Sequence, residues 1–322
     1  MKVIAFQKGP AHGVVGRQCV AACGCHAAQL VHELDDGLVA VAQQADLAGR
    51  WSVEVDVRGK NGHLPVYDLL RGRTHRAQII GIGHQRSRGL KAGAVVDLDA
   101  AEQSIRQAVD AAERMAAAGL DGVEFECYGH LMDQFMSPFT NSLAAPYGGS
   151  LENRARFSME VLAACRKRVG DNFLLGVRYT ADEGEAGGLS ADDGIAIGKM
   201  FRDSGLVDFL NIIKGRIHTD AAMTDVIPIH GMKSAPHLDF AGRVKAEVGL
   251  PTFHAARIPD VATARHAVAT GQVDMVGMTR AHMADPHIVR KIIEGREEDI
   301  RPCVGATYCL DRIYQGGMAL CI

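Results

Sequence analysis

The chain has 322 residues, 47% of them hydrophobic and 23% charged, and its formal net charge is −3. This composition is typical of a globular protein with a buried core. It holds neither a basic run for nucleic acid nor the roughly 20 consecutive apolar residues of a membrane span. The opening residues carry no secretion signal, so the eight cysteines are expected to be thiols or metal ligands in a cytoplasmic protein.

The first 96 residues show an irregular pattern. Residues 26–50 predict a helix followed by a strand, and residues 51–70 predict a hairpin that turns at Lys60-Asn61-Gly62. One more strand is expected at residues 77–83. This part of the chain lacks the regular rhythm that begins near residue 97.

From residue 97 onward, strand-like and helix-like segments alternate. The first helix opens with Asp99 and Glu102 in capping-box positions, and later helices are expected to begin near Ser150, at Ser190 and at Pro259-Asp260, with a last one near 285–295. The expected strands are 122–127, 172–179, 207–213, 250–256 and 272–278. Short apolar strands that alternate with helices indicate a parallel sheet with helical crossovers. An α/β barrel is favoured over an open doubly wound sheet, because no Gly-x-Gly-x-x-Gly motif follows a strand.

Polar residues follow these strands at their carboxyl ends, where α/β barrels hold their active sites. They are Tyr128, His130, Arg178, Lys214, Arg216, Arg257 and Arg280. Arg257 and Arg280 come before expected helices, so a phosphate bound between the last two strands is one interpretation, and ion pairs at the barrel rim are the other. Tyr128 and His130 could bind or protonate a substrate, or could simply shape a loop.

Four segments together resemble the old yellow enzyme family of flavoproteins. They are "DGVEFECYGHLMDQFMSPFTNSLAAPYGGSLENRARF", "LLGVRYTADE", "PTFHAARIPD" and "VDMVGMTRAHMADP". The terminal cysteines point to its iron–sulfur branch, which includes trimethylamine, dimethylamine and histamine dehydrogenases and 2,4-dienoyl-CoA reductase. The resemblance implies a (β/α)8 TIM barrel, with an FMN-binding core at 97–300, a cysteine segment at 301–322, and an N-terminal part at 1–96 that is expected to be incomplete or irregular.

The resemblance also carries over a set of FMN ligands. The arginine on the fifth strand lies against the N1/O2 region of the flavin, where a cation stabilises the reduced form. The residues after the last two strands hold the phosphate, and a glutamine near the N-terminus binds the flavin edge. The matching residues are Gln43, Arg178, Ala256, Arg257, Gly277 and Arg280.

Tyr128 and His130 are the expected catalytic residues, and they depart from the family pattern. The segment that holds them is one residue shorter than usual, which argues against the simplest enoate reductases. The expected activity is an amine dehydrogenase that removes N-methyl groups by hydride transfer to flavin N5. Two alternatives stay open: an enoate or 2,4-dienoyl-CoA-type reductase that uses NAD(P)H, and a non-catalytic truncated barrel, since the first two family strands are not evident in residues 1–30.

Cys303, Cys309 and Cys321 match the first, third and fourth cysteines that bind a [4Fe–4S] cluster in this branch, whereas Ala306 stands at the second position. Alanine cannot ligate iron. The sequence therefore leaves open a three-cysteine cluster, a fourth ligand from elsewhere, or no cluster. The expected partners are a small-molecule amine or enone and an external electron acceptor or donor, and a homo-oligomer stays open.

Overall fold

Five parallel strands form the centre of the computed structural model. Each strand pairs with the next along the chain, in the order β7-β8-β9-β10-β11. Their bounds are Gly122–Glu126 (β7), Leu174–Asp182 (β8), Phe209–Lys214 (β9), Thr252–His254 (β10) and Met275–Gly277 (β11). All five lie within the strands that the sequence predicted or extend them by a few residues, so the predicted parallel α/β sheet is confirmed.

The structure describes residues 98–129 and 131–322, with side chains from residue 101 onward, and the backbone of six short strands between residues 2 and 52. The short strands are β1 (Lys2–Lys8), β2 (Arg17–Gln18), β3 (Leu30–Leu34), β4 (Gly37–Ala40), β5 (Gln44–Ala45) and β6 (Trp51–Ser52). β1 runs antiparallel to β7, and β3 runs antiparallel to β11. The parallel strands therefore make a half-barrel with antiparallel strands at both edges, which confirms a barrel that is irregular at its N-terminus.

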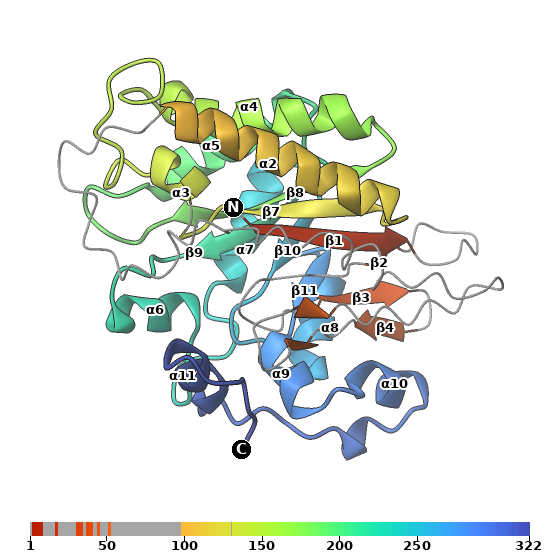
Figure 1. Cartoon of the computed structure of the whole chain (residues 1–322). Helices are drawn as coiled ribbons and strands as arrows, with labels where there is room; N and C mark the ends of the chain where they lie inside the picture. Colours follow the sequence, from red (N-terminus) through yellow and green to blue (C-terminus); the bar gives the residue numbers. More distant parts are fainter. Residues whose placement is uncertain are drawn as a thin grey trace.

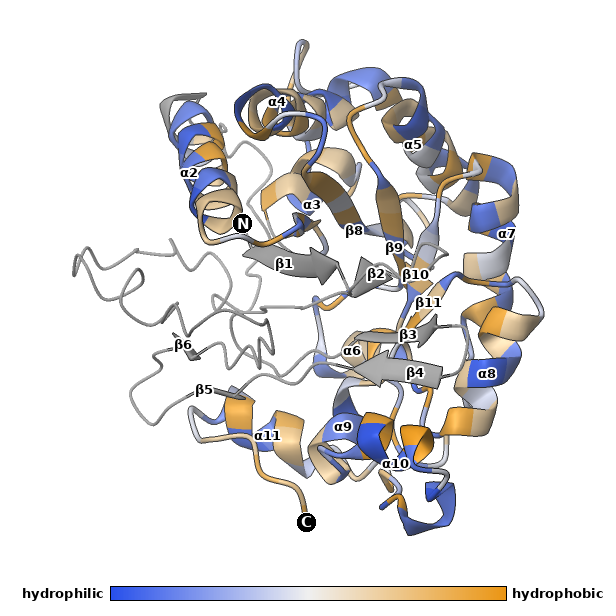
Figure 2. Ribbon diagram, turned by 90° about the vertical axis from the view of Figure 1, so that its right-hand side faces the viewer, coloured by the Kyte–Doolittle hydropathy of each residue, from blue (hydrophilic) through white to orange (hydrophobic). Residues whose placement is uncertain are grey.

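The helices cover the outer face of this half-barrel. Figure 2 shows α2, α4, α5, α7 and α8 in an arc around the strands, and Figure 1 shows α9, α10 and α11 gathered near the C-terminus. The longer helices are α2 (Leu98–Ala117), α4 (Leu151–Val169), α5 (Ala191–Asp203), α7 (Leu238–Val248) and α8 (Val261–Ala269). The shorter ones are α3 (Leu131–Met136), α6 (Asp220–Val226), α9 (Thr279–Ala284), α10 (Ile288–Ile293), α11 (Tyr308–Tyr314) and the 3-10 turn η1 (Glu297–Asp299). No helix in the described part of the chain is long and apolar enough to cross a membrane.

Side-chain caps begin three helices where the sequence predicted a start. Ser150 accepts the Asn153 N–H at the start of α4, and Ser190 accepts the Asp193 N–H at the start of α5. Asp260 accepts the Thr263 N–H at the start of α8, at 2.8 Å. Each cap satisfies a backbone donor that the helix itself leaves unpaired.

Three local predictions need correction. Helix α2 begins at Leu98, so Asp99 lies in its first turn rather than at its N-cap. Residues 26–50, predicted as helix then strand, contain the antiparallel pair β3 and β4 instead, because two apolar runs separated by a short polar step favour a hairpin. Arg280 lies inside α9 rather than before a helix.

The two faces of the sheet carry different side chains. Val123 and Phe125 of β7 are fully buried and belong to the apolar layer between the strands and the helices. On the alternate face, the Phe209 and Phe253 rings stack with centroids 4.6 Å apart, and the Phe209 ring lies over Gly176. A Cβ at Gly176 would meet that ring at 1.9 Å. Aromatic rings therefore fill the inner space of the half-barrel at the level of Gly176 and Phe209. Space for a ligand is expected instead at the carboxyl ends of the strands.

Candidate active site

Tyr128 follows β7 and lies beside Arg178, which is inside β8 and not after the strand as the sequence predicted, because β8 continues to Asp182. The Arg178 guanidinium lies 5.0 Å from the centre of the Tyr128 ring, and its Nη1 lies 3.6 Å from Glu126 Oε1. Glu126 and Arg178 are opposite each other in the register of the two strands. The aromatic face and the buried carboxylate together hold a cation on the inner face of the half-barrel.

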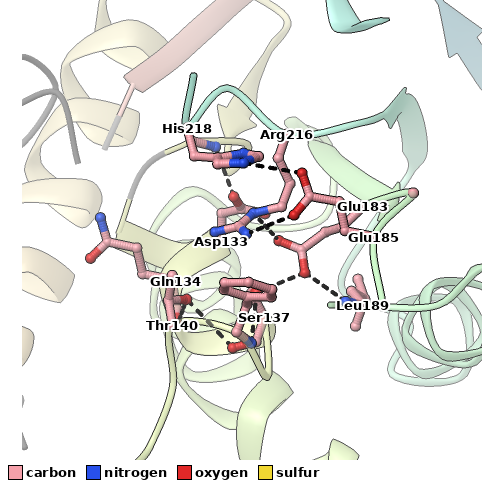
Figure 3. Close-up of polar contacts among 12 residues, drawn as sticks. Asp133, Gln134, Ser137, Thr140, Glu183, Glu185, Leu189, Arg216 and His218 are labelled. Carbon is pink, nitrogen blue, oxygen red and sulfur yellow. Dashed lines mark hydrogen bonds and ion pairs between the residues drawn. The ribbon is translucent and has the colours of Figure 1, made fainter. Parts of the chain in front are cut away.

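A second polar group lies just beyond β8 and β9 (Figure 3). Glu183 is buried, and its Oε2 accepts hydrogen bonds from the Ser137 hydroxyl at 2.8 Å and the Leu189 N–H at 2.6 Å. Arg216 lies within 3.0 Å of the other Glu183 oxygen. Arg216 also reaches Glu185 at 3.5 Å. These contacts tie three loops together at one edge of the sheet.

Asp133, in the first turn of α3, fixes the loop that carries Tyr128. Its Oδ2 accepts the Gly129 N–H at 2.9 Å. Gly129 has φ +67, and a Cβ there would lie 2.4 Å from Ile217 Cδ1, so the loop needs glycine at this point. The pKa of Asp133 is raised to about 7, chiefly by burial and also by the nearby Glu183 charge, while its hydrogen bonds and Arg216 oppose the rise. Asp133 is therefore a loop-holding carboxyl that titrates near neutral pH.

Arg257 and Arg280 lie at the ends of β10 and β11. Arg257 adopts φ +48, an uncommon backbone conformation for a residue with a side chain, and its Nε donates to the Met232 carbonyl at 3.0 Å. Arg280 Nη2 donates to the Pro228 carbonyl at 2.8 Å, while its buried Nη1 has no hydrogen-bond partner among the described residues. Burial lowers the pKa of Arg280, and the neighbouring Arg257 lowers it too. Two cations and a donor without a partner among the described residues make this end of the sheet a candidate anion-binding site.

The C-terminal segment packs beside these two arginines. A Cβ at Gly305 would lie 2.4 Å from Arg257 Nη1, so the segment approaches that guanidinium closely. Burial raises the pKa of Cys309; the Leu310 backbone N–H and Arg280 favour its thiolate, while Cys303 and Cys321 oppose it. The three cysteines and Arg280 thus share one neighbourhood. Even so, no three Cys, His, Asp or Glu side chains in the described part of the chain are arranged to hold a metal ion.

The predicted site residues fall into two groups. Tyr128 and Arg178 lie together on the β7–β9 side, and Arg257, Arg280 and the three cysteines lie together on the β10–β11 side. Ala256 and Gly277 are buried at the ends of β10 and β11. Gln43 and His130 lie outside the described residues.

Five polar residues of the site escaped the sequence prediction. They are Glu124, Glu126, Asp133, Glu183 and Asn211. For three of them a signal existed, since Glu124, Glu126 and Asn211 are polar residues inside apolar strands, and such residues in a barrel point to the inner face. The partners of Asp133 and Glu183 come from separate loops, which no local pattern reveals.

Comparison with known proteins gives a consistent picture. The model of the NADH:flavin oxidoreductase / NADH oxidase family matches residues 41–299. A probable N-methylproline demethylase from Rhizobium meliloti (strain 1021) is 68% identical over 221 residues, which cover 69% of this chain and 33% of that protein. An N,N-dimethylglycine/sarcosine dehydrogenase from Chromohalobacter salexigens is 42% identical over 226 residues, with 69% and 33% covered.

Among solved structures, a 2-naphthoyl-CoA reductase in complex with 2-naphthoyl-CoA is similar with a TM-score of 0.65 and 30% sequence identity. The similarity covers 70% of this chain and 34% of that one. The chain therefore spans about a third of the length of the relatives that it matches.

Proposed function

The chain belongs to the NADH:flavin oxidoreductase / NADH oxidase family, and we propose that it forms the FMN-binding part of an enzyme that oxidises N-methylated amines. In this proposal residues 97–300 are the flavin-binding core, residues 1–96 complete the barrel irregularly, and residues 301–322 are a cysteine segment. The protein acts in the cytoplasm on a small molecule and exchanges electrons with an external partner.

The observation that carries the proposal is the pair of arginines at the ends of β10 and β11. Arg280 keeps a buried Nη1 that has no partner among the described residues, beside the like charge of Arg257. A buried donor without an acceptor, next to a second positive charge, destabilises the folded protein unless an anion binds to both. The phosphate of FMN fits this need, with Ala256 and Gly277 supplying the small residues beside it.

Flavin binding tests this assignment directly. In Arg280→Met, the affinity for FMN should fall about ten- to a hundredfold, because a hydrogen bond to a charged group is worth roughly 1.5–3 kcal/mol. Riboflavin, which lacks the phosphate, should bind both proteins equally. Arg290→Met, an exposed position on α10, is the matched control and should leave FMN affinity unchanged. An equal loss for FMN and riboflavin would show that Arg280 supports the fold and not the phosphate.

The flavin ring belongs at the other group of residues. Arg178 would place its positive charge at the pyrimidine edge, and Glu126 with the Tyr128 ring keeps the guanidinium in position. The bound flavin supplies the hydride acceptor. Asp133 holds the Gly129 backbone, which sets the position of Tyr128 beside the substrate space. His130 belongs to the same loop and is proposed as the second substrate-binding residue.

An amine with an N-methyl group is the proposed substrate, because the relatives at 68% and 42% identity are named for N-methylproline and for N,N-dimethylglycine and sarcosine. The neutral amine loses a hydride from its methyl carbon, which leaves an iminium ion. Water adds to the iminium carbon, and the adduct releases formaldehyde and the demethylated amine. Tyr128 and His130 would orient the nitrogen and keep it unprotonated.

Anaerobic titration of the FMN-reconstituted chain tests the activity. Stoichiometric bleaching of the flavin by N-methylproline or N,N-dimethylglycine, with formaldehyde released, is the expected result. Bleaching by NADPH followed by reoxidation with an enone, and no response to the amines, would instead favour a reductase, the activity for which the 2-naphthoyl-CoA complex is named. A chain that binds no flavin would favour a barrel without catalysis.

An iron–sulfur cluster at Cys303, Cys309 and Cys321 is the further part of the proposal. It is supported by their shared neighbourhood, yet Ala306 leaves the thiolate set one short, and among the described residues no three Cys, His, Asp or Glu side chains are placed to hold a metal ion together. The residues present do not complete the site by themselves. Analysis of iron and sulfide in anaerobically prepared protein decides it, and Cys309→Ser should halve or abolish any iron found.

A further inference from the structure

Two glutamates lie buried on the inner face of the half-barrel. Glu124 is 0% exposed and Glu126 is 2% exposed, and both alternate along β7 with the outward-facing Val123 and Phe125. Glu126 lies opposite Arg178 in register. Carboxylates this deeply buried need partners of their own, because an uncompensated buried charge is strongly destabilising.

The two glutamates have different partners. Glu126 has an ion pair with Arg178, at 3.6 Å between Oε1 and Nη1. Glu124 instead receives a hydrogen bond at Oε2 from Asn211 Nδ2, at 3.0 Å. Asn211 lies opposite Arg178 on the neighbouring strand β9. One glutamate is thus paired with a cation and the other with a neutral amide.

Two acceptor atoms in this arrangement lack a donor. Glu124 Oε1 and Asn211 Oδ1 are both buried, and neither has a hydrogen-bond partner among the described residues. If Glu124 were ionised, both atoms would be acceptors with nothing to accept. A single proton on Oε1 would serve both, because it would donate to Oδ1 while Nδ2 donates to Oε2. The carboxylic acid and the amide would then form a ring of two hydrogen bonds.

We infer that Glu124 is held as a neutral carboxylic acid by Asn211, and that it is a positioning residue which keeps the charge around Arg178 from becoming negative. The inference rests on the proposed function, since that charge matters because Arg178 is to face the flavin. Glu126 already balances the guanidinium. A second carboxylate at Glu124 would leave this group of buried side chains with a net charge of minus one, which opposes the negative charge of a reduced flavin.

The surrounding groups agree with a neutral acid. The pKa of Glu124 is raised to about 7, chiefly by burial and to a smaller extent by Glu126, while Arg178 and the Asn211 hydrogen bond oppose the rise. Cys127, which directly follows β7, is also fully buried and burial raises its pKa well above the usual value, so it adds no charge. On the other neighbouring strand, the backbone of Ile4 pairs with Glu124. Glu124 therefore gains its charge only near and above neutral pH.

The first test uses the protein without flavin. Glu124→Gln reproduces both hydrogen bonds of the neutral acid, so it should unfold at nearly the same temperature as the wild type at pH 4, below the ordinary glutamate value of 4.5, and at a higher temperature at pH 8. The difference infrared spectrum between the two proteins at pH 5 should contain the C=O stretch of a protonated carboxylic acid. Glu126→Gln, which removes the paired glutamate, should not remove that band. Absence of the band from the difference spectrum, or a Gln variant destabilised equally at both pH values, would overturn the neutral acid.

The second test measures the midpoint potential of bound FMN by dithionite titration, which needs no amine substrate. The wild-type potential should fall more steeply between pH 6 and pH 8 than that of Glu124→Gln, and at pH 8 the variant should favour the reduced flavin by on the order of tenfold. Identical pH slopes would refute the positioning role. Because neither test depends on turnover, a failure of amines to reduce the flavin would count against the proposed function alone.

Discussion

Replacing Glu183 with glutamine should destabilise the protein far more than the same change at Glu185. Both carboxylates pair with Arg216, at 3.0 and 3.5 Å. Each variant therefore removes one negative charge that lies beside the same guanidinium. They differ in environment: the Glu183 side chain is 2% exposed and the Glu185 side chain 33%. This contrast makes them a matched pair.

The expected magnitude follows from what each oxygen does. Glu183 Oε2 accepts from Ser137 and Leu189, and a glutamine would have to keep its oxygen there. Its NH2 group would then face the Arg216 Nε–H, donor against donor. Breaking a buried ion pair from one side costs about 3–5 kcal/mol, whereas a largely solvated pair is worth about 0–1 kcal/mol. Glu183→Gln should therefore cost several kcal/mol and Glu185→Gln less than about 1 kcal/mol.

Urea unfolding followed by circular dichroism gives both free energies, and the double variant gives their coupling. Glu183→Gln should also lower the pKa of Asp133, because burial and the Glu183 charge together hold it near 7. Equal losses of stability in the two single variants would refute the reasoning, since they would mean that burial does not decide the worth of these pairs.

Other changes have expected outcomes of their own. Asp133→Asn keeps an acceptor for Gly129 but cannot titrate. The folded protein holds the Asp133 proton up to about pH 7, whereas the unfolded chain releases it near the ordinary aspartate pKa of 3.8, so wild-type stability should fall as the pH rises between those values. The stability of the variant should fall less, which thermal midpoints at pH 5 and pH 8 would reveal. Gly176→Ala forces a methyl group against the Phe209 ring and should cost about 1–3 kcal/mol or more. Gly242→Ala in α7, where the nearest atoms are 3.5 Å away, should gain up to about 1 kcal/mol, so a loss there as large as at Gly176 would contradict the packing argument.

Much of the fold could be predicted from local patterns. The βα alternation, the caps at Ser150, Ser190 and Asp260, and the five parallel strands were all readable, because each depends on residues close in sequence. The family resemblance was readable for the same reason and is confirmed by the match over residues 41–299. The antiparallel pairing of β1 with β7 was not readable, since the two strands are more than a hundred residues apart.

The candidate site divides in the same way. The sequence by itself determined which residues lie near the carboxyl ends of the strands, so it predicted Tyr128, Arg178, Arg257 and Arg280 as site residues. It also determined the cysteine pattern, which lacks its second member. Only the tertiary structure decided how they are paired: Glu126 with Arg178, Glu124 with Asn211, and Glu183 with Arg216. The physical reason is that a pattern along the chain fixes the face and the end of a strand on which a side chain lies. The ion-pair and hydrogen-bond partners of that side chain lie on neighbouring strands. Those strands meet only when the sheet has formed.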